Sequence, residues 1–473
     1  MSHPPVHLQG RVAIRVVLVF GFAYFLSYAM RAINAVIAPA LSTDLQLSHA
    51  DLGLLSAAYF MGFGLMQLPI GVWLDRHGPR RTESALLLFG AAGAAIFAAS
   101  ETLLGVWVGR ALIGVGVSAC LMAAFKAFRV WYPPERQSQL GSWMLVMGTA
   151  GALSATVPVA MLMPLLGWRT IFFGVAAALL LAAWILYRGL HDVEQSMSSQ
   201  ASAAIQSSDA AKGKPETDNS TQNESDAAKG KPATYNLTQK ESDAATDKPA
   251  ADNSSQNEPG YAGIFADPYF RRMALLGAVH QGGFMALQSL WAGPWMITVL
   301  GMSVEQASHV LFLFNFALLV AYLGLSWWAP RYVAYGQRAG LPVLKVVAVG
   351  LCLAVLVQIL MAVLPYPDSW WLWIVFAVAI TVTTLSQTHV SLAFPTSLVG
   401  RANSAFNLTL FIGAFSVQWG IGLLVDWFAA QGWDGAAAMR MAMACYLLLQ
   451  VFALWRFVRQ WSIQAPAIAL NMH

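Results

Sequence analysis

The sequence predicts an all-α membrane protein whose twelve transmembrane helices form two six-helix bundles with pseudo-two-fold symmetry, joined by a disordered cytoplasmic linker. This prediction rests on the composition, on the number of apolar runs and on the placement of charge between them. The 473 residues are 58% hydrophobic and 11% charged, and their mean hydropathy is +0.57. A soluble domain of this size would not tolerate so much apolar surface. We therefore expect a chain that crosses the lipid bilayer many times.

Twelve apolar runs are about long enough to cross the ~30 Å hydrocarbon core as helices. The first half of the chain holds six of them, at residues 13–41, 52–74, 84–100, 103–130, 140–165 and 171–187. The second half holds six more, at residues 273–300, 304–328, 346–364, 370–394, 405–428 and 436–458. Ser48 with Asp51 and Ser303 with Gln306 have the spacing of capping boxes. They lie at equivalent ends of the second and eighth spans, so the two halves match there.

Basic residues lie almost entirely on one side of this arrangement. If the N-terminus is inside, the outer segments keep only Arg169 and Arg440. The inner segments hold the other loop arginines, which are Arg11, Arg15, Arg76, Arg80, Arg81, Arg129, Arg136, Arg188, Arg271, Arg272, Arg331, Arg338, Arg401, Arg456 and Arg459. Positively charged loops stay in the cytoplasm. Both termini are therefore predicted to be cytoplasmic, in a cell membrane that we expect to be the bacterial inner membrane.

The two bundles are expected at residues 1–192 and 261–473. Between them, residues 193–260 are rich in Ser, Asp, Ala, Lys, Asn and Gln and poor in apolar side chains. Such a segment cannot bury enough surface to fold. It contains a repeat of about 17 residues that begins at Ser208, Ser225 and Ser242. We interpret the segment as a disordered spacer.

The loop between the second and third spans concentrates polar residues in an apolar region. It has the pattern Gly-x-x-x-Asp-Arg-x-Gly-x-Arg-Arg, formed by Gly71, Asp75, Arg76, Gly78, Arg80 and Arg81. Asp75 can accept hydrogen bonds from these arginines or from the N-terminus of a neighbouring helix. The two glycines permit close helix approach and a tight turn. The arginines could instead serve only to set the topology.

This loop and the six-plus-six spans resemble the major facilitator superfamily of secondary transporters. Three further motifs resemble it as well: Arg110-x-x-x-Gly114-x-Gly116 in span four, Trp131-Tyr-Pro-Pro-Glu-Arg136 after it, and Gly167-Trp168-Arg169 opening span six. The resemblance implies alternating access, in which two bundles rock about a central site. It also implies that the 71–81 loop acts as an inner latch, with Arg401 as a partner.

Charged side chains are costly inside a span, so Arg31 and Arg110 are candidate functional residues. Tyr24, Tyr28 and Arg31 fall within about 60° on a helix with 100° per residue. This face carries two hydroxyls and a guanidinium, and we interpret it as a platform for a ligand. Arg31 could instead snorkel to the outer surface, and Arg110 could serve helix packing or proton coupling.

Spans seven and eleven carry further polar faces. In span seven, one arc of about 100° holds His280, Gln281, Phe284, Gln288, Trp291 and Trp295. The resemblance implies that spans one, four, seven and ten line the cavity. A similar arc of span eleven holds Asn403, Asn407, Phe411 and Gln418, although such stripes also join membrane helices to each other. The candidate substrate-binding residues on these two spans are His280, Gln281, Gln288, Trp291 and Asn407.

No acidic residue lies deep in a predicted span. The acidic residues nearest to the spans, Asp75, Glu83, Glu135 and Asp426, are all near span ends. Arg31 and Arg110 thus have no obvious buried counter-ion, and a substrate anion could supply it. His280 is the remaining titratable candidate for proton coupling, and Lys126 is expected to snorkel to the inner surface.

The leading hypothesis is a monomeric transporter of a small anion, working by anion exchange or proton coupling. Two alternatives stay open: transport of amphipathic compounds such as drugs or siderophores, and a membrane sensor or assembly factor that transports nothing. No nucleophile–base pair, metal cluster or phosphate loop is visible in the sequence, so we expect no enzymatic activity, cofactor or bound metal. The expected partners are the solute and the lipid bilayer, and the charge pattern gives nucleic-acid binding no support.

Overall fold

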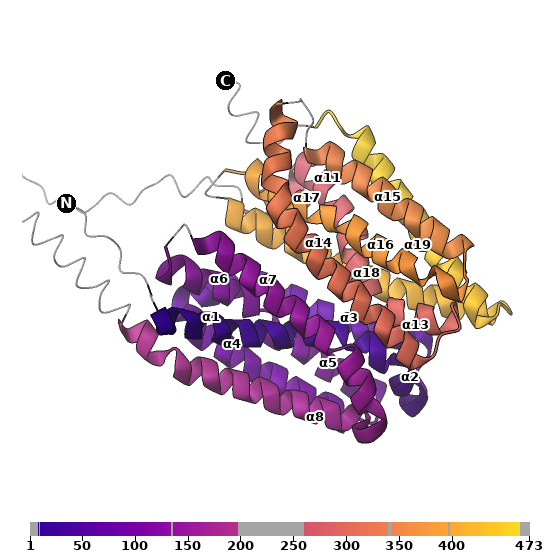
Figure 1. Cartoon of the computed structure of the whole chain (residues 1–473), viewed down its shortest axis with the longest axis horizontal. Helices are drawn as coiled ribbons and strands as arrows, with labels where there is room; N and C mark the ends of the chain where they lie inside the picture. The colour runs from indigo at the N-terminus through magenta and orange to yellow at the C-terminus, as the bar shows by residue number, and fades with distance from the viewer. Residues whose placement is uncertain are drawn as a thin grey trace, which may run out of the picture.

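The computed structural model describes residues 8, 10–133, 136–196, 260–338, 343–395 and 398–463. These residues form two helical bundles that lie side by side, one from each half of the chain (Figure 1). The prediction of twelve transmembrane helices in two bundles is confirmed. Most of the predicted linker, residues 197–259 with their repeats, lies outside the described residues, as does Glu135.

The first bundle contains spans one to six. Its helices are α1 (Gly10–Ala32), α2 (Asn34–Leu45), α3 (His49–Leu65), α4 (Gln67–Ala99), α5 (Leu103–Val117), α6 (Cys120–Trp131), α7 (Gln137–Ser154) and α8 (Val157–Gly189). Helical structure continues to Ser196, so four residues of the predicted linker belong to the helix that ends this bundle.

The second bundle contains spans seven to twelve. Its helices are α10 (Tyr261–Ala266), α11 (Pro268–Leu276), η3 (Gly277–Gly282), α12 (Gly283–Ala286), η4 (Leu287–Trp291), α13 (Ala292–Thr298), α14 (Val304–Arg338), α15 (Val343–Val363), η5 (Pro367–Trp370), α16 (Trp371–Ile380), η6 (Thr381–Thr383), α17 (Thr384–Ala393), α18 (Val399–Ala430) and α19 (Gly435–Arg459). Both capping boxes form, because the Ser48 and Ser303 side chains accept from the amides of Asp51 and Gln306.

Nine helices of the described chain are long and apolar enough to cross a membrane. The other three spans are formed from shorter pieces. α3 has 17 residues and is followed by the first part of α4, while span five is divided between α7 and α8. Span seven is divided most, because η3 and η4 are π-helical segments within it.

Two glycines make the turns that separate spans within α4 and α8. Gly78 has φ 77° and ψ 168°, and Gly167 has φ 70° and ψ 162°. Residues with a Cβ rarely adopt a positive φ. The tight turn predicted at Gly78 is thus present, and it brings span three back antiparallel to span two.

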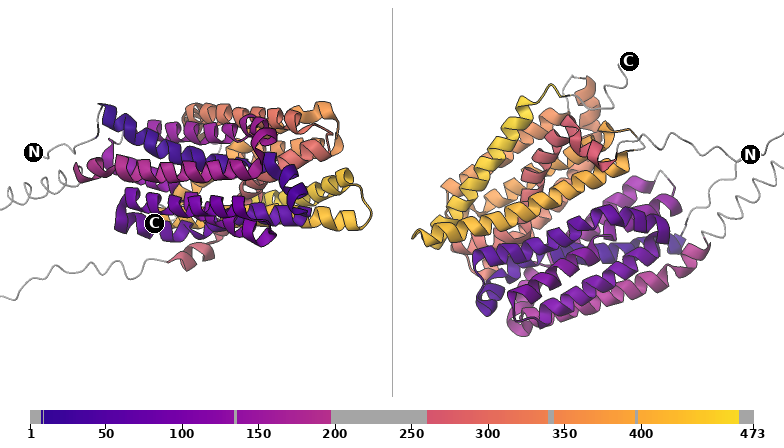
Figure 2. Two further views of the ribbon diagram at one scale, coloured as in Figure 1. Left: turned by 90° about the horizontal axis from the view of Figure 1, so that it is seen from below. Right: turned by 180° about the vertical axis from the view of Figure 1, so that it is seen from behind.

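The molecule has two different ends. We call the end at which Gly10, Trp131, Gly189, Gly260 and Arg459 lie the linker end, and the opposite end, with the turns near Leu45, Ser100, Gly301 and Gln431, the hairpin end. The two bundles meet at the hairpin end and diverge toward the linker end (Figures 1 and 2).

Small residues allow this meeting at the hairpin end. A Cβ added to Gly293 of α13 would overlap the Ala35 carbonyl of α2, and one added to Gly422 of α18 would overlap the His49 carbonyl of α3. Asp426 of α18 also accepts hydrogen bonds from the backbone amides of His49 at 3.1 Å and Ala50 at 2.7 Å. The second bundle therefore caps a helix of the first.

Candidate functional site

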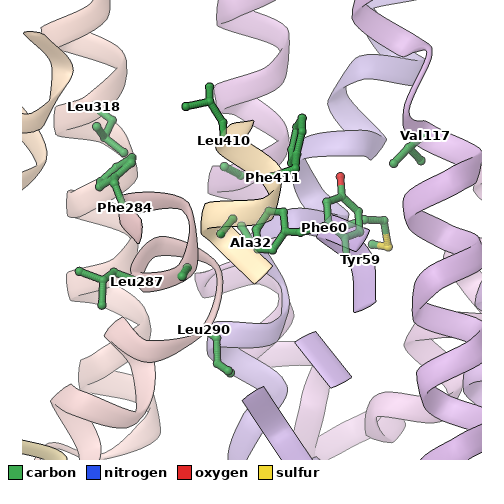
Figure 3. Packing of buried hydrophobic residues seen from close by; sticks show 14 of the residues in the cluster. Ala32, Tyr59, Phe60, Val117, Phe284, Leu287, Leu290, Leu318, Leu410 and Phe411 are labelled. Atoms are coloured by element: carbon green, nitrogen blue, oxygen red, sulfur yellow. The ribbon is translucent and has the colours of Figure 1, made fainter. Parts of the chain in front are cut away.

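A cavity of about 380 Å³ lies between the two bundles. Its walls come from α1, α3, α4, α5, α6 and α7 of the first bundle and from η3, α12, η4, α14, η6, α17 and α18 of the second. Phe411 of α18 closes the wall between the bundles, with its ring centroid 4.5 Å from that of Phe63 and 6.2 Å from that of Phe60. Figure 3 shows Phe411 of the second bundle beside Phe60 of the first.

Arg31 is the charged side chain of this cavity. No other Lys, Arg, Asp or Glu occurs among the described residues that line it. The guanidinium carbon lies 4.7 Å from the centroid of the Tyr28 ring and 5.6 Å from that of Phe63. Arg31 is 8% exposed, and its buried Nε has no hydrogen-bond partner. The aromatic rings hold the cation, but they leave a buried donor without an acceptor.

Amide and hydroxyl side chains line the rest of the polar wall. Gln288 donates to Asn315 at 2.9 Å, and Gln387 donates to Asn407 at 2.9 Å. Gln281 is 9% exposed, and its side-chain carbonyl oxygen has no hydrogen-bond partner. The other polar residues of the lining are Tyr24, Ser27, Tyr28, Gln67, Ser118, Thr149, Tyr322, Thr383 and Thr384. The cavity can therefore bind a small solute that carries both charge and hydrogen-bonding groups.

The structure divides the nine predicted substrate-binding residues into two groups. Six line the cavity: Tyr24, Tyr28, Arg31, Gln281, Gln288 and Asn407. Arg110, His280 and Trp291 do not line it and are each 1% exposed. Sequence reasoning missed Asn315, Gln387 and Gln67, although a lone amide in an apolar span is itself a signal of a functional site.

Arg110 contacts the back of α1 instead of the cavity. Its Nη2 donates to the Met30 carbonyl at 2.6 Å, and its guanidinium lies 5.2 Å from the Tyr59 ring centroid. Because Met30 precedes Arg31, this bond fixes the backbone that carries Arg31. The contact supports the packing alternative for Arg110.

His280 and Trp291 lie on the side of span seven that faces away from the cavity. His280 is buried beside Gln450 of α19. The Trp291 indole donates to the Gln418 carbonyl at 3.0 Å, which ties span seven to span eleven. Trp295 is also buried outside the lining. Of the aromatic residues on the predicted faces of spans seven and eleven, Phe284 and Phe411 line the cavity.

Two of the predicted latch residues, Asp75 and Arg80, make contacts within the first bundle. Lys126 of α6 forms an ion pair with Asp75, whose side chain is exposed at the linker end. Arg80 donates from Nε to Glu194 at 2.5 Å and from Nη1 to the Tyr187 carbonyl at 3.0 Å. A Cβ placed on Gly71 would meet no atom within 4 Å. Arg76 and Arg81 are exposed, and Arg401 lies in the first turn of α18.

A family model of the Major Facilitator Superfamily matches residues 20–417. The chain belongs to the Major Facilitator Superfamily. This membership, together with the apolar helices, makes it a multi-pass membrane transporter and not an enzyme. In the part of the chain that the structure describes, no group of three or more His, Cys, Asp or Glu side chains could hold a metal ion.

Curated relatives match this transporter over parts of their length. A probable L-galactonate transporter of Escherichia coli (strain K12) is 25% identical over 194 residues, which are 40% of this chain and 43% of that protein. The nitrate/nitrite transporter NrtP of a Picosynechococcus species is 31% identical over 114 residues, which are 24% of this chain and 21% of that protein. The chain thus matches less than half the length of these relatives.

A solved structure shares the fold over nearly the whole chain. A bacterial homologue of the human lysosomal transporter Spinster, in an inward-facing and unoccupied conformation, superposes with a TM-score of 0.68 at 18% identity. The match covers 95% of this chain and 97% of that chain.

Proposed function

We propose that this transporter moves a small anion across the membrane by alternating access and that Arg31 is its anion-binding group. The observation that carries the proposal is the position of Arg31. It is the charged residue of a cavity built from both bundles, and no carboxylate lies among the described lining residues. A buried cation without a counter-ion is unfavourable. An anionic solute that enters the cavity would supply the missing counter-ion and bind the Arg31 guanidinium directly.

The chemistry of the cavity favours a carboxylate or a similar oxyanion. A guanidinium presents paired N–H donors that match two oxygens of one anion. The hydroxyls of Tyr24 and Tyr28, on the same face of α1, can add donors beside it. The solutes for which the two relatives are named, L-galactonate and nitrate or nitrite, are anions, which agrees with this proposal.

The proposed sidedness follows from charge and from the packing of the two ends. The positively charged loops assign the linker end to the cytoplasm. The capping of α3 by Asp426 closes the hairpin end, whereas Asp75 has a side chain that is 79% exposed at the linker end. In this proposal the structure is the state that faces the cytoplasm.

Thermal unfolding of the purified protein in detergent tests the proposal. We expect at least one anion from a panel of nitrate, phosphate, gluconate, glucuronate and sulfoacetate to raise the apparent Tm of the wild type. The matched uncharged control for gluconate is glucose. Arg31→Ala should lose the anion-dependent shift, and Arg31→Lys should keep part of it because it keeps the charge without the paired donors. Equal stabilisation of the wild type and Arg31→Ala would contradict the proposal.

A further inference from the structure

Glu83 is buried in a way that its sequence position did not predict. It lies in α4, five residues after the turn at Gly78, and it is the one carboxylic acid of the described residues with 0% exposure. Neither carboxyl oxygen has a hydrogen bond of normal geometry. Although Glu83 lies near the end of a span, water does not reach its side chain, because neighbouring helices cover it.

Close helix packing keeps water away from Glu83. α4 packs along α5, α6 and α8. A Cβ added to Gly116 would overlap the backbone of Gly90, so these helices are in direct contact. About two turns from Gly90 along α4, Glu83 faces the thiol of Cys120 at the start of α6. A thiol is only a weak hydrogen-bond donor, so it does not replace the water that a carboxylate would lose.

The cations near this part of the first bundle are bonded to other groups. Arg80 is bonded to Glu194, and Lys126 is paired with Asp75. Arg110 donates to the Met30 carbonyl. Cys120 is the titratable group of the described residues that interacts with Glu83. A carboxylate in this position would be an uncompensated buried charge, which is strongly unfavourable. Glu83 is therefore the neutral acid in the state that the structure describes.

We propose that Glu83 is a proton-binding site through which this carrier couples proton movement to alternating access. This inference rests on the proposed function, because it requires that the two bundles alternate between two states. The state described here holds the proton on the carboxyl group. When α4 and α6 shift and water reaches Glu83, the acid gives its proton to water, leaving a carboxylate and a hydronium ion. Reprotonation restores the described state.

The coupling has a definite direction. The described state binds the proton more tightly than the alternative state, in which water reaches Glu83. Acidic pH therefore favours the described state, and alkaline pH favours the alternative state. Loss of the proton should thus open the hairpin end. Glutamine is similar in size to the neutral acid but cannot release a proton, so Glu83→Gln should hold the described state at every pH.

Distance measurement by electron paramagnetic resonance tests this without a substrate. Spin labels are placed at Glu101→Cys and Gln431→Cys, two exposed hairpin-end positions in different bundles, in a background with Cys352→Ser and Cys445→Ala. Cys120 is fully buried and stays unlabelled. In otherwise wild-type protein in lipid nanodiscs, we expect the population with the longer distance to rise several-fold between mildly acidic and alkaline pH.

Three variants decide the outcome. Glu83→Gln should abolish the pH response, Glu83→Asp should keep a response with a changed midpoint, and the exposed control Glu305→Gln should titrate like the wild type. A wild type with no pH response, or a Glu83→Gln variant that titrates normally, overturns the proposal. If Glu83→Gln fails to fold, a Glu83→Asp midpoint identical to that of the wild type overturns it. Failure of every anion to stabilise the wild type would contradict the proposed function and leave this readout unchanged.

Discussion

The guanidinium of Arg110 donates a 2.6 Å hydrogen bond to the carbonyl of Met30, the residue before Arg31. A side chain of span four thus fixes the part of span one that presents the cation of the cavity. Arg110 holds the backbone of α1, and Arg31 lines the cavity.

Replacing Arg110 should weaken anion binding while leaving the stability of the protein almost unchanged. Arg110→Met removes a buried charge whose Nε and Nη1 have no partners, so the desolvation that it relieves offsets the lost hydrogen bond. We expect the apparent Tm in detergent to change little. Anion affinity should fall about tenfold, because a loosely held Arg31 loses roughly 1.4 kcal/mol of binding. Arg110→Lys should recover part of the affinity. Unchanged anion affinity in Arg110→Met would argue against a positioning role.

The two glycines of the 71–81 loop should respond in opposite ways to alanine. Gly78→Ala places a Cβ at φ 77° and 2.8 Å from Glu194 Oε1, so it should destabilise the first bundle by about 1–2 kcal/mol. Gly71 lies in a helix with open space around it, and Gly71→Ala should stabilise by roughly 0.5–1 kcal/mol. Guanidinium chloride unfolding in detergent measures both changes.

If the inner latch requires close approach at Gly71, the same Gly71→Ala variant should transport more slowly despite its higher stability. A Gly71→Ala protein with wild-type transport would show that this glycine is not a latch contact.

Asp426→Asn should loosen the hairpin end. The Asp426 carboxylate accepts from two backbone amides at the start of α3, and an amide side chain accepts more weakly than a carboxylate at a helix N-terminus. The measurement is maleimide labelling of Ala35→Cys, which lies in the closed contact with Gly293. We expect labelling to become several-fold faster. Asp434→Asn is the control, because Asp434 caps α19 within its own bundle. Equal labelling rates in the two variants would mean that the inter-bundle cap does not hold the closure.

The ion pair between Asp44 and Arg169 should contribute a pH-dependent stability. Bonding to Arg169 lowers the pKa of the Asp44 carboxyl. A lowered folded-state pKa means that the contribution is fully present above the ordinary aspartate pKa and is lost as the pH falls through the folded-state pKa. Asp44→Asn should therefore lower the apparent Tm slightly at neutral pH, and the difference should vanish in strong acid. Asp368→Asn, exposed at the same end, is the control. A Tm difference that persists in strong acid would contradict this assignment.

The sequence predicts the fold well because hydropathy and charge act over whole spans. It also predicts the Tyr24, Tyr28 and Arg31 face, since α1 is regular over those residues. The prediction for span seven is less accurate for a specific reason. A wheel with 100° per residue assumes an α-helix, but η3 and η4 are π-helical. The wider turns separate Gln281 and Gln288 from His280 and Trp291, which the α-helical wheel placed on one face.

Tertiary contacts decide the remaining differences. The partners of Arg110 and Lys126, which are the Met30 carbonyl and Asp75, lie on other helices. Glu83 shows the same limit, because its burial depends on how closely α4 meets α5 and α6. Periodicity within one helix contains no information on these contacts.

Counterflow in proteoliposomes tests the role of Arg31 in anion transport most directly. Vesicles are loaded with an excess of the anion that best stabilises the purified protein, and the same isotope-labelled anion is added outside. We predict that wild-type vesicles accumulate the labelled anion transiently. Arg31→Ala should lower the initial rate about 10- to 100-fold, because a hydrogen bond to a charged group contributes about 1.5–3 kcal/mol. Arg31→Lys should lower the rate by less. Wild-type counterflow by a correctly folded Arg31→Ala protein would contradict the account.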